Sequence, residues 1–194
     1  MPEVSTLLTV GLAPALTVSH QERHVLAPAE RFGVILESER DNDVLTTVSV
    51  AAVDADPVTI RIHWSSSAAA DFHVLFVPET NLLFVGGGQI SAAVDLSEMV
   101  VATQEAPLLF WSFERVDRYV VEYGELECLL YDLNGHVLDR ASVDPPYEVH
   151  RLAHGIHFVS MVAGSTWLTF PVVTPAGERG ARASNPTAAR GPRI

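Results

Sequence analysis

Three closely spaced histidines are the side chains in this sequence best suited to hold a metal ion: His150, His154 and His157. If His154 begins a two-residue hairpin turn, His150 and His157 lie diagonally on one strand face, with His154 at the tip. Imidazoles gathered in this way can bind Zn²⁺ or Ni²⁺, and Glu148 or His136 would supply a fourth ligand. The spacing matches no established zinc signature. Surface histidines are therefore the favoured interpretation, and the three residues are a candidate metal site.

The aromatic segment Phe110-Trp111-Ser112-Phe113 is the second candidate. Strict alternation along a strand places Phe110 and Ser112 on one face and Trp111 and Phe113 on the other. Aromatic side chains on both faces indicate a strand covered on both sides, or one whose outer face meets a partner or ligand. Core packing is the favoured interpretation. If the segment is a binding surface instead, Trp111 and Phe113 are the partner-binding residues.

Catalytic chemistry has little support elsewhere in the chain. Glu125 and Glu127 share a strand face, with Glu122 nearby in sequence, but no apolar pocket is evident that would raise one pKa for acid–base work. A solvated acidic face is favoured. The nucleophile-elbow, dinucleotide and P-loop signatures are missing, and the absence of lysine excludes Schiff-base chemistry. We therefore expect no catalytic residue and no cofactor.

A triple-glycine segment, Gly86-Gly87-Gly88, could be taken for a phosphate-binding loop. It lies between two expected strands, and no helix follows whose N-terminus would attract an anion. A bulge or a tight bend in the backbone is the favoured interpretation.

Charge and composition limit the kinds of partner that the chain can bind. Its 194 residues are 48% hydrophobic and carry a net charge of −12. Four arginines and one glutamate in Ala176–Ile194 give that segment +3, which leaves −15 for the preceding 175 residues. An acidic body argues against nucleic-acid binding, and no apolar run is long enough to span a membrane. The high apolar content indicates a large core or an apolar surface that contacts another protein.

The amino-terminal segment and the residue usage predict a bacterial cytoplasmic protein. The apolar stretch LLTVGLAPAL follows Glu3, where a signal peptide would carry positive charge, and Gly11 and Pro14 interrupt it. All twelve basic residues other than histidine are arginine, which is typical of a GC-rich bacterial genome.

Strand patterns dominate the chain, and the clearest is the hairpin around Asn134-Gly135. Asn-Gly favours a type I′ turn with positive φ at both residues, between strands 126–133 and 136–143. This register places Leu126 and Cys128 on one apolar face, so Cys128 should be a buried, inert thiol. Further strands are expected near 32–37, 44–53, 58–64, 72–77, 81–85, 89–96, 108–113, 118–123, 147–152, 156–162 and 166–173. One helix of about two turns is expected after Ser19, which has capping-box spacing to Glu22.

A weak internal repeat links two of these regions at an offset of 37 residues. Gly87 aligns with Gly124, Asp95-Leu96 aligns with Asp132-Leu133, and Val53-Asp54 is a candidate third copy. The phrase LLYDLNGHVLDR resembles the blades of quinoprotein-like propellers, in which a strand ends in Asp, turns at Gly and returns. Over about residues 72–145 the chain is similar to uncharacterised bacterial all-β proteins with such repeats. The resemblance implies propeller-like blades.

These observations predict one all-β domain over residues 1–174 and a disordered tail rich in Arg, Ala, Gly and Pro over 175–194. The strands should form an antiparallel meander folded as a sandwich or a partly closed barrel, with propeller-like blades as the alternative and little helix. The expected function is a non-enzymatic intracellular interaction or assembly module that binds a protein partner or itself. The alternative is a small metal- or carbohydrate-binding protein that uses the histidines at 150–157 or the aromatics at 110–113.

Overall fold

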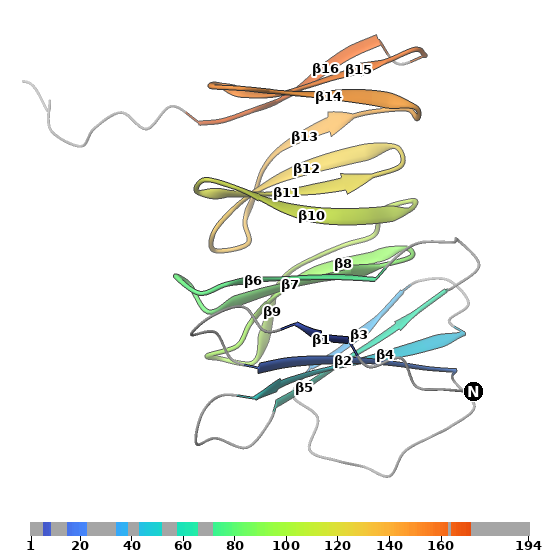
Figure 1. Ribbon diagram of the computed structural model, residues 1–194, viewed down its shortest axis with the longest axis vertical. Coiled ribbons are helices and arrows are strands. Elements are labelled where there is room, and N and C mark those ends of the chain that lie inside the picture. Colours follow the sequence, from blue (N-terminus) through green and yellow to red (C-terminus); the bar gives the residue numbers. More distant parts are fainter. Residues whose placement is uncertain are drawn as a thin grey trace, which may run out of the picture.

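The computed structural model describes residues 6–8, 15–22, 34–38, 43–51, 58–65, 72–162 and 164–171. These residues form sixteen β-strands in four sheets and no helix. The sheets are stacked face to face in a column (Figure 1). The expectation of an all-β fold is confirmed. The expected tail at 175–194 and the candidate repeat copy at Val53-Asp54 lie outside the described residues.

The first sheet has the strand order β1-β2-β4-β5-β3. Its strands are β1 (Thr6–Leu8), β2 (Ala15–Glu22), β3 (Val34–Glu37), β4 (Val44–Ala51) and β5 (Val58–Trp64). All pairs are antiparallel except β3 with β5. The helix expected after Ser19 is wrong, because Ser19 lies within β2. There it pairs with Thr47 of β4, and the pairing over the whole length of β2 overrides the local capping signal.

The second and third sheets are four-stranded antiparallel meanders in sequence order, the arrangement of propeller blades. The second contains β6 (His73–Val77), β7 (Leu82–Gly87), β8 (Ile90–Asp95) and β9 (Val100–Glu105). The third contains β10 (Phe110–Val116), β11 (Tyr119–Gly124), β12 (Glu127–Asp132) and β13 (Val137–Ser142). Leu82 and Tyr119 begin equivalent strands 37 positions apart, so the offset seen in the sequence is the spacing between two blades. The propeller-like alternative therefore describes these sheets.

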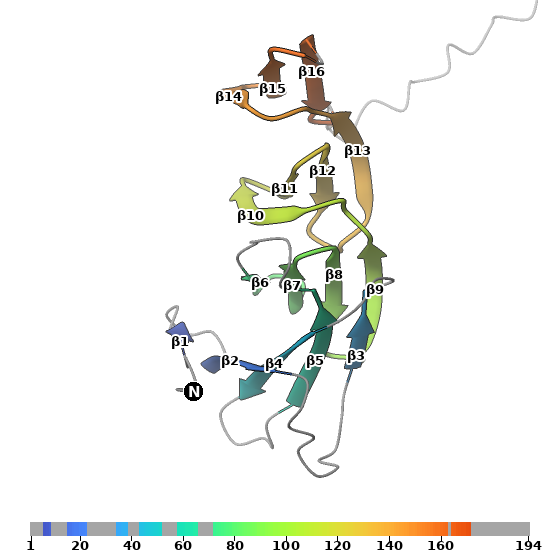
Figure 2. The same ribbon diagram turned by 90° about the vertical axis from the view of Figure 1, so that its right-hand side faces the viewer.

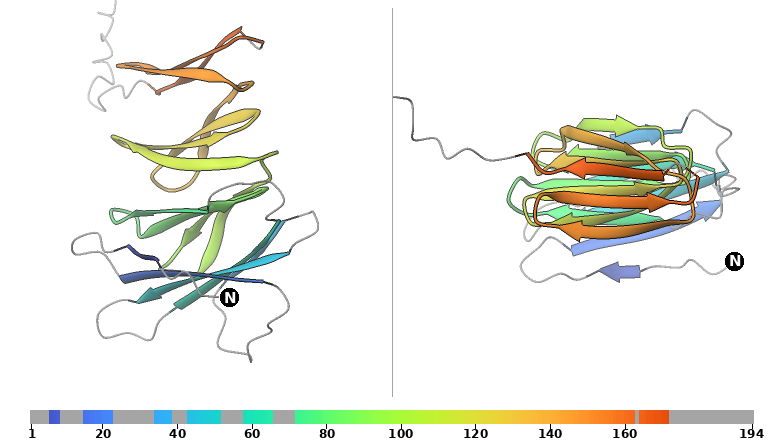
Figure 3. Two further views of the ribbon diagram at one scale, coloured as in Figure 1. Left: turned by 45° about the vertical axis from the view of Figure 1, so that its right-hand side comes forward. Right: turned by 90° about the horizontal axis from the view of Figure 1, so that it is seen from above.

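The last sheet continues the repeat with three strands, β14 (Tyr147–Leu152), β15 (Gly155–Ser160) and β16 (Gly164–Thr169). Phe110 and Tyr147, which begin β10 and β14, are again 37 positions apart. Viewed down the stack, the strand axes of successive sheets are roughly aligned (Figure 3). The last sheet was not predicted as a copy of the repeat because its residue types differ from those of the second and third sheets.

Three apolar clusters fill the three spaces between consecutive sheets. Ile60 and Ile62 of the first sheet pack with Leu83 and Val85 of the second. Corresponding clusters lie between the second and third sheets and between the third and last. Strands β7 and β11 therefore have neighbours on both faces, and every residue in them is buried. Sheets packed through two apolar faces account for the high hydrophobic content.

The β12–β13 hairpin forms as predicted, with a different turn. Only Gly135 has a positive φ, +81°, so the type I′ assignment is wrong. Asp132 accepts hydrogen bonds at Oδ1 from the backbone N–H groups of Asn134 (2.8 Å) and His136 (2.9 Å), which closes a longer loop. A bulge at Leu138 restores the predicted register farther along the strands. The turn also contacts the second sheet, where the Thr103 hydroxyl donates to the carbonyl of Gly135 (2.7 Å).

The part of the chain that the structure describes holds no helix with the length and hydrophobicity of a membrane span.

Candidate functional site

Trp111 and Phe113, the residues expected to form a partner surface, both pack between sheets. Phe113 is 4% exposed and lies 4.8 Å from Phe110, centroid to centroid, in the core shared with the second sheet. Trp111 is partly buried on the opposite face and stacks on Tyr147 of the last sheet at 5.3 Å. A bulge between Phe110 and Ser112 breaks the alternation, so Phe110 and Phe113 share a face. The packing between sheets favoured from the sequence is what the structure shows, and the alternative surface position of Trp111 and Phe113 is corrected.

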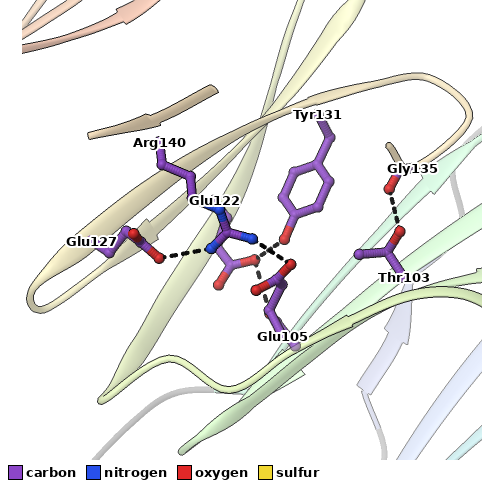
Figure 4. A network of polar contacts seen from close by, with 8 residues as sticks. Thr103, Glu105, Glu122, Glu127, Tyr131, Gly135 and Arg140 are labelled. Carbon is purple, nitrogen blue, oxygen red and sulfur yellow. Dashed lines mark hydrogen bonds and ion pairs between the residues drawn. The ribbon is translucent and has the colours of Figure 1, made fainter. Parts of the chain in front are cut away.

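A buried carboxyl group lies between the second and third sheets (Figure 4). Glu122 of β11 is 1% exposed. Its Oε2 accepts hydrogen bonds from the hydroxyls of Tyr131 (2.7 Å) and Ser91 (2.9 Å), the latter from β8 of the neighbouring sheet. Burial raises the pKa of Glu122 to about 7, the two hydroxyl donors oppose that rise, and the charges of Glu105 and Glu127 add to it. The expectation of a solvated carboxylate is wrong for this residue.

Arginine–glutamate pairs also join neighbouring sheets. Arg140 of β13 contacts Glu105 of β9 at 2.7 Å and Glu127 of its own sheet at 3.0 Å (Figure 4). The Arg115 guanidinium contacts both carboxylate oxygens of Glu79, at 2.8 and 2.9 Å. Glu122 is enclosed and its neighbours are paired, so this network connects the second and third sheets.

Cys128 is confirmed as a buried thiol. It is fully buried opposite Ala141, in the cluster that also contains Leu130 and Val143. Burial raises the pKa of Cys128 to about 11, so almost no thiolate forms at neutral pH. Leu126, expected on the same face, precedes β12 and is 45% exposed.

The triple-glycine segment serves close packing of aromatic rings. Gly88 has a positive φ, +55°, in the turn after β7, so the expected tight bend is confirmed. A Cβ atom at Gly86 would lie 2.6 Å from the ring of Phe110, and one at Gly87 would lie 2.8 Å from the ring of Phe72. Glycine is needed here because side chains of neighbouring segments press against the backbone.

A shallow pocket of about 160 Å³ lies where the first and second sheets meet. Its walls mix polar, acidic and apolar side chains, and one acidic wall residue, Glu105, is paired with Arg140. The lining residues are Glu37, Ser38, Gln89, Ile90, Gln104, Glu105 and Ala106.

The three histidines of the candidate metal site lie on the last sheet. The turn consists of Ala153 and His154, one residue earlier than expected, so His150 and His157 are directly paired, not diagonal. Their ring centroids are 5.9 Å apart on one face, as the sequence indicated, and His154 lies at the tip. His154 stacks on Trp167 at 5.4 Å, so the rings form a row with the indole.

Neither expected fourth ligand completes a metal site. Glu148 Oε2 lies 3.4 Å from His150 Nε2, and His136 belongs to the third sheet, where it contacts Asp132 at 3.1 Å. Among the described residues, no group of three or more His, Cys, Asp or Glu side chains is arranged to hold a metal ion. Metal binding by the histidines stays a prediction.

The face of the last sheet that carries these rings points away from the third sheet. Strand register puts Ile156, Phe158 and Leu168 on the covered side, where each is fully buried. We call the opposite side the open face. It consists of Glu148, His150, Leu152, His157, Val159, Ser165, Trp167 and Thr169.

Large apolar side chains are exposed on this face. Leu152 is 43% exposed and Trp167 is 39% exposed, and the indole stacks on His157 at 4.2 Å. In the adjoining β15–β16 turn, Met161 is 89% exposed and Val162 is 81% exposed. Trp167 was not predicted as a surface residue. It alternates with Leu168 on a strand that was predicted, so its position on the face opposite Leu168 could have been inferred.

No protein-family model and no curated protein matches the chain. Among solved structures, BamB from Moraxella catarrhalis is similar over 64% of this chain and 40% of that chain, with 9% sequence identity and a TM-score of 0.33. This similarity is too low to bear on function. The blade-like character of the sheets follows from their own meander topology and 37-residue spacing.

Proposed function

We propose that the chain is a non-enzymatic protein-interaction module whose partner binds the open face. The observation that carries the proposal is the exposure of Leu152 and Trp167 on a sheet face. The equivalent strands β7 and β11 of the preceding sheets are buried on both faces, whereas β15 is covered on one face only. Large apolar and aromatic side chains exposed together on one sheet face are typical of protein-binding sites.

The proposal can be tested by site-specific photocrosslinking in the cells that express the protein. A benzophenone amino acid replaces Leu152 on the open face, or Leu138 on β13 as the matched control, since the two side chains are 43% and 40% exposed. We expect a discrete protein adduct from position 152 and none from position 138. Absence of an adduct at 152, or equal adducts at both positions, would contradict the proposal.

Two features expected from the sequence stay predictions beside this proposal. Fractionation of the native host tests the bacterial cytoplasmic location. Metal analysis of protein purified without a polyhistidine tag tests the alternative of a metal-binding protein that uses His150, His154 and His157.

A further inference from the structure

We infer that the occupant of the open face is a second copy of this chain, bound face to face about a two-fold axis. This inference rests on the proposed function and names the partner. Three properties of the described residues support it: the way the chain already buries its sheets, the distribution of charge, and the more polar outer side of the first sheet.

The chain buries each sheet against another sheet. Phe84 of the second sheet packs on Phe113 of the third at 5.5 Å, and Tyr123 of the third packs on Phe158 of the last at 6.3 Å. Aligned sheets packed in this way lie about 10 Å apart and interdigitate through one face. The open face is a further surface of the same kind, so a β-sheet is the partner shape that suits it. A second copy supplies such a sheet.

Charge favours contact between two open faces. The chain has 24 acidic residues against 12 arginines, but the open face carries a single carboxylate, Glu148. The Arg151 side chain lies on the covered side and donates to Glu114 at 2.7 Å. Two copies that meet through their open faces therefore keep most acidic groups apart.

The opposite end of the stack matches the open face less well. On the outer side of the first sheet, the side chains of the central strands β4 and β5 are mostly polar, and they are half-buried or buried. The large apolar side chain exposed on that side, Ile35, lies on the edge strand β3. Contact between two open faces is isologous, and it closes at a dimer without forming a filament.

The centre of such a contact is the row of rings formed by His150, His157 and Trp167, which crosses the three strands. Leu152 lies beside this row and is the apolar side chain on the face most exposed to solvent. Desolvation at the centre of an interface makes such residues the main contributors to affinity. Because the interface is symmetric, a charge introduced at position 152 occurs twice in the dimer, and each copy opposes binding through the open face.

Sedimentation equilibrium of the full chain tests the inference. We expect a dimer for the wild type, and a dissociation constant raised roughly ten-fold or more by Leu152→Arg. Leu138→Arg introduces the same charge at a site of similar exposure and should leave the dimer unchanged. Circular dichroism checks folding. If Leu152→Arg fails to fold, Ser165→Arg on the same face takes its place.

A wild type that stays monomeric at every concentration would overturn the inference, as would equal weakening by the arginine variants at 152 and 138. A monomer that dimerises only after residues 172–194 are removed would also overturn it, in favour of the chain's own C-terminal segment as the occupant. If the full chain is monomeric but a photocrosslinker at 152 captures a different protein, the second-copy inference fails and the proposed function stands.

Discussion

A carboxyl group enclosed between two sheets carries a free-energy cost that depends on its protonation. Glu122 receives two hydroxyl hydrogen bonds, and Arg140 pairs with the two nearby carboxylates of Glu105 and Glu127. The donors to Glu122 itself are the uncharged hydroxyls of Ser91 and Tyr131. Burial therefore dominates, and the pKa of Glu122 is about 7. The protonated acid is the form that the stack accommodates best.

The Glu122→Gln variant should remove a pH dependence of stability between about pH 4.5 and pH 7. The pKa of Glu122 is raised from 4.5 to about 7 on folding, so the folded state binds the proton more tightly than the unfolded state. The stabilisation of the folded state by protonated Glu122 is fully present below pH 4.5 and is lost as the pH rises to 7. This loss lowers the free energy of unfolding by an amount on the order of 2–3 kcal/mol. Urea unfolding at pH 5 and pH 8 measures this change. The same pH slope in both proteins would contradict it.

At the scale of elements, the same turn chemistry recurs in neighbouring blades. Asp95 accepts at Oδ1 from the backbone N–H groups of Ser97 (2.7 Å) and Glu98 (3.2 Å), as Asp132 does in the following sheet. An aspartate that ends a strand and closes the next turn is a local signal, so sequence analysis could find it. The contacts of that turn with the neighbouring sheet are not local and were not foreseeable.

Most strands could be predicted, while bulges could not. Tyr147–Leu152 is a mostly exposed edge strand, yet it was located from alternation, and its bounds agree with the structure. Val100–Glu105 was missed because its residues, VVATQE, do not alternate between apolar and polar. The bulge at Trp111 has no sequence signature, so the predicted faces of that segment failed. The burial of Glu122 was also not predicted. It lies in YVVEYG, whose burial depends on sheets that are distant in sequence.

Substitutions at two glycines distinguish the cost of backbone strain from the cost of crowding between sheets. Gly135 and Gly164 both have positive φ, +81° and +75°. A Cβ at Gly135 would lie 2.8 Å from Cβ of Ala93 on the second sheet, whereas a Cβ at Gly164 meets nothing within 4 Å. We expect Gly164→Ala to destabilise by about 1–2 kcal/mol through strain, and Gly135→Ala by roughly 1–3 kcal/mol more through overpacking. Chemical denaturation measures both, and equal losses would show that the turn does not press on the second sheet.

At the scale of the whole molecule, each sheet depends on its neighbours for burial. The edge-on view shows β6, β10 and β14 along one side of the stack and β9 and β13 along the other (Figure 2). In the second, third and last sheets, contacts between side chains far apart in sequence cross from one sheet to the next, as Ser91 meets Glu122 and Arg151 meets Glu114. In such stacks, stability is approximately a sum of sheet terms and neighbour terms. A side chain inside the stack and one on its open face should therefore respond differently to the same change.

Trp111 and Trp167 provide that comparison within one chain. Trp111 lies between the third and last sheets, stacked on Tyr147, while Trp167 is 39% exposed on the open face. We expect Trp111→Arg to destabilise by about 3 kcal/mol or more, because a guanidinium replaces an aromatic ring that fills the space between sheets. Trp167→Arg should cost roughly 1 kcal/mol or less, since its ring already meets water. Urea denaturation followed by circular dichroism measures both, at a protein concentration low enough that association adds nothing. Similar losses for the two variants would mean that the open face is covered within the monomer.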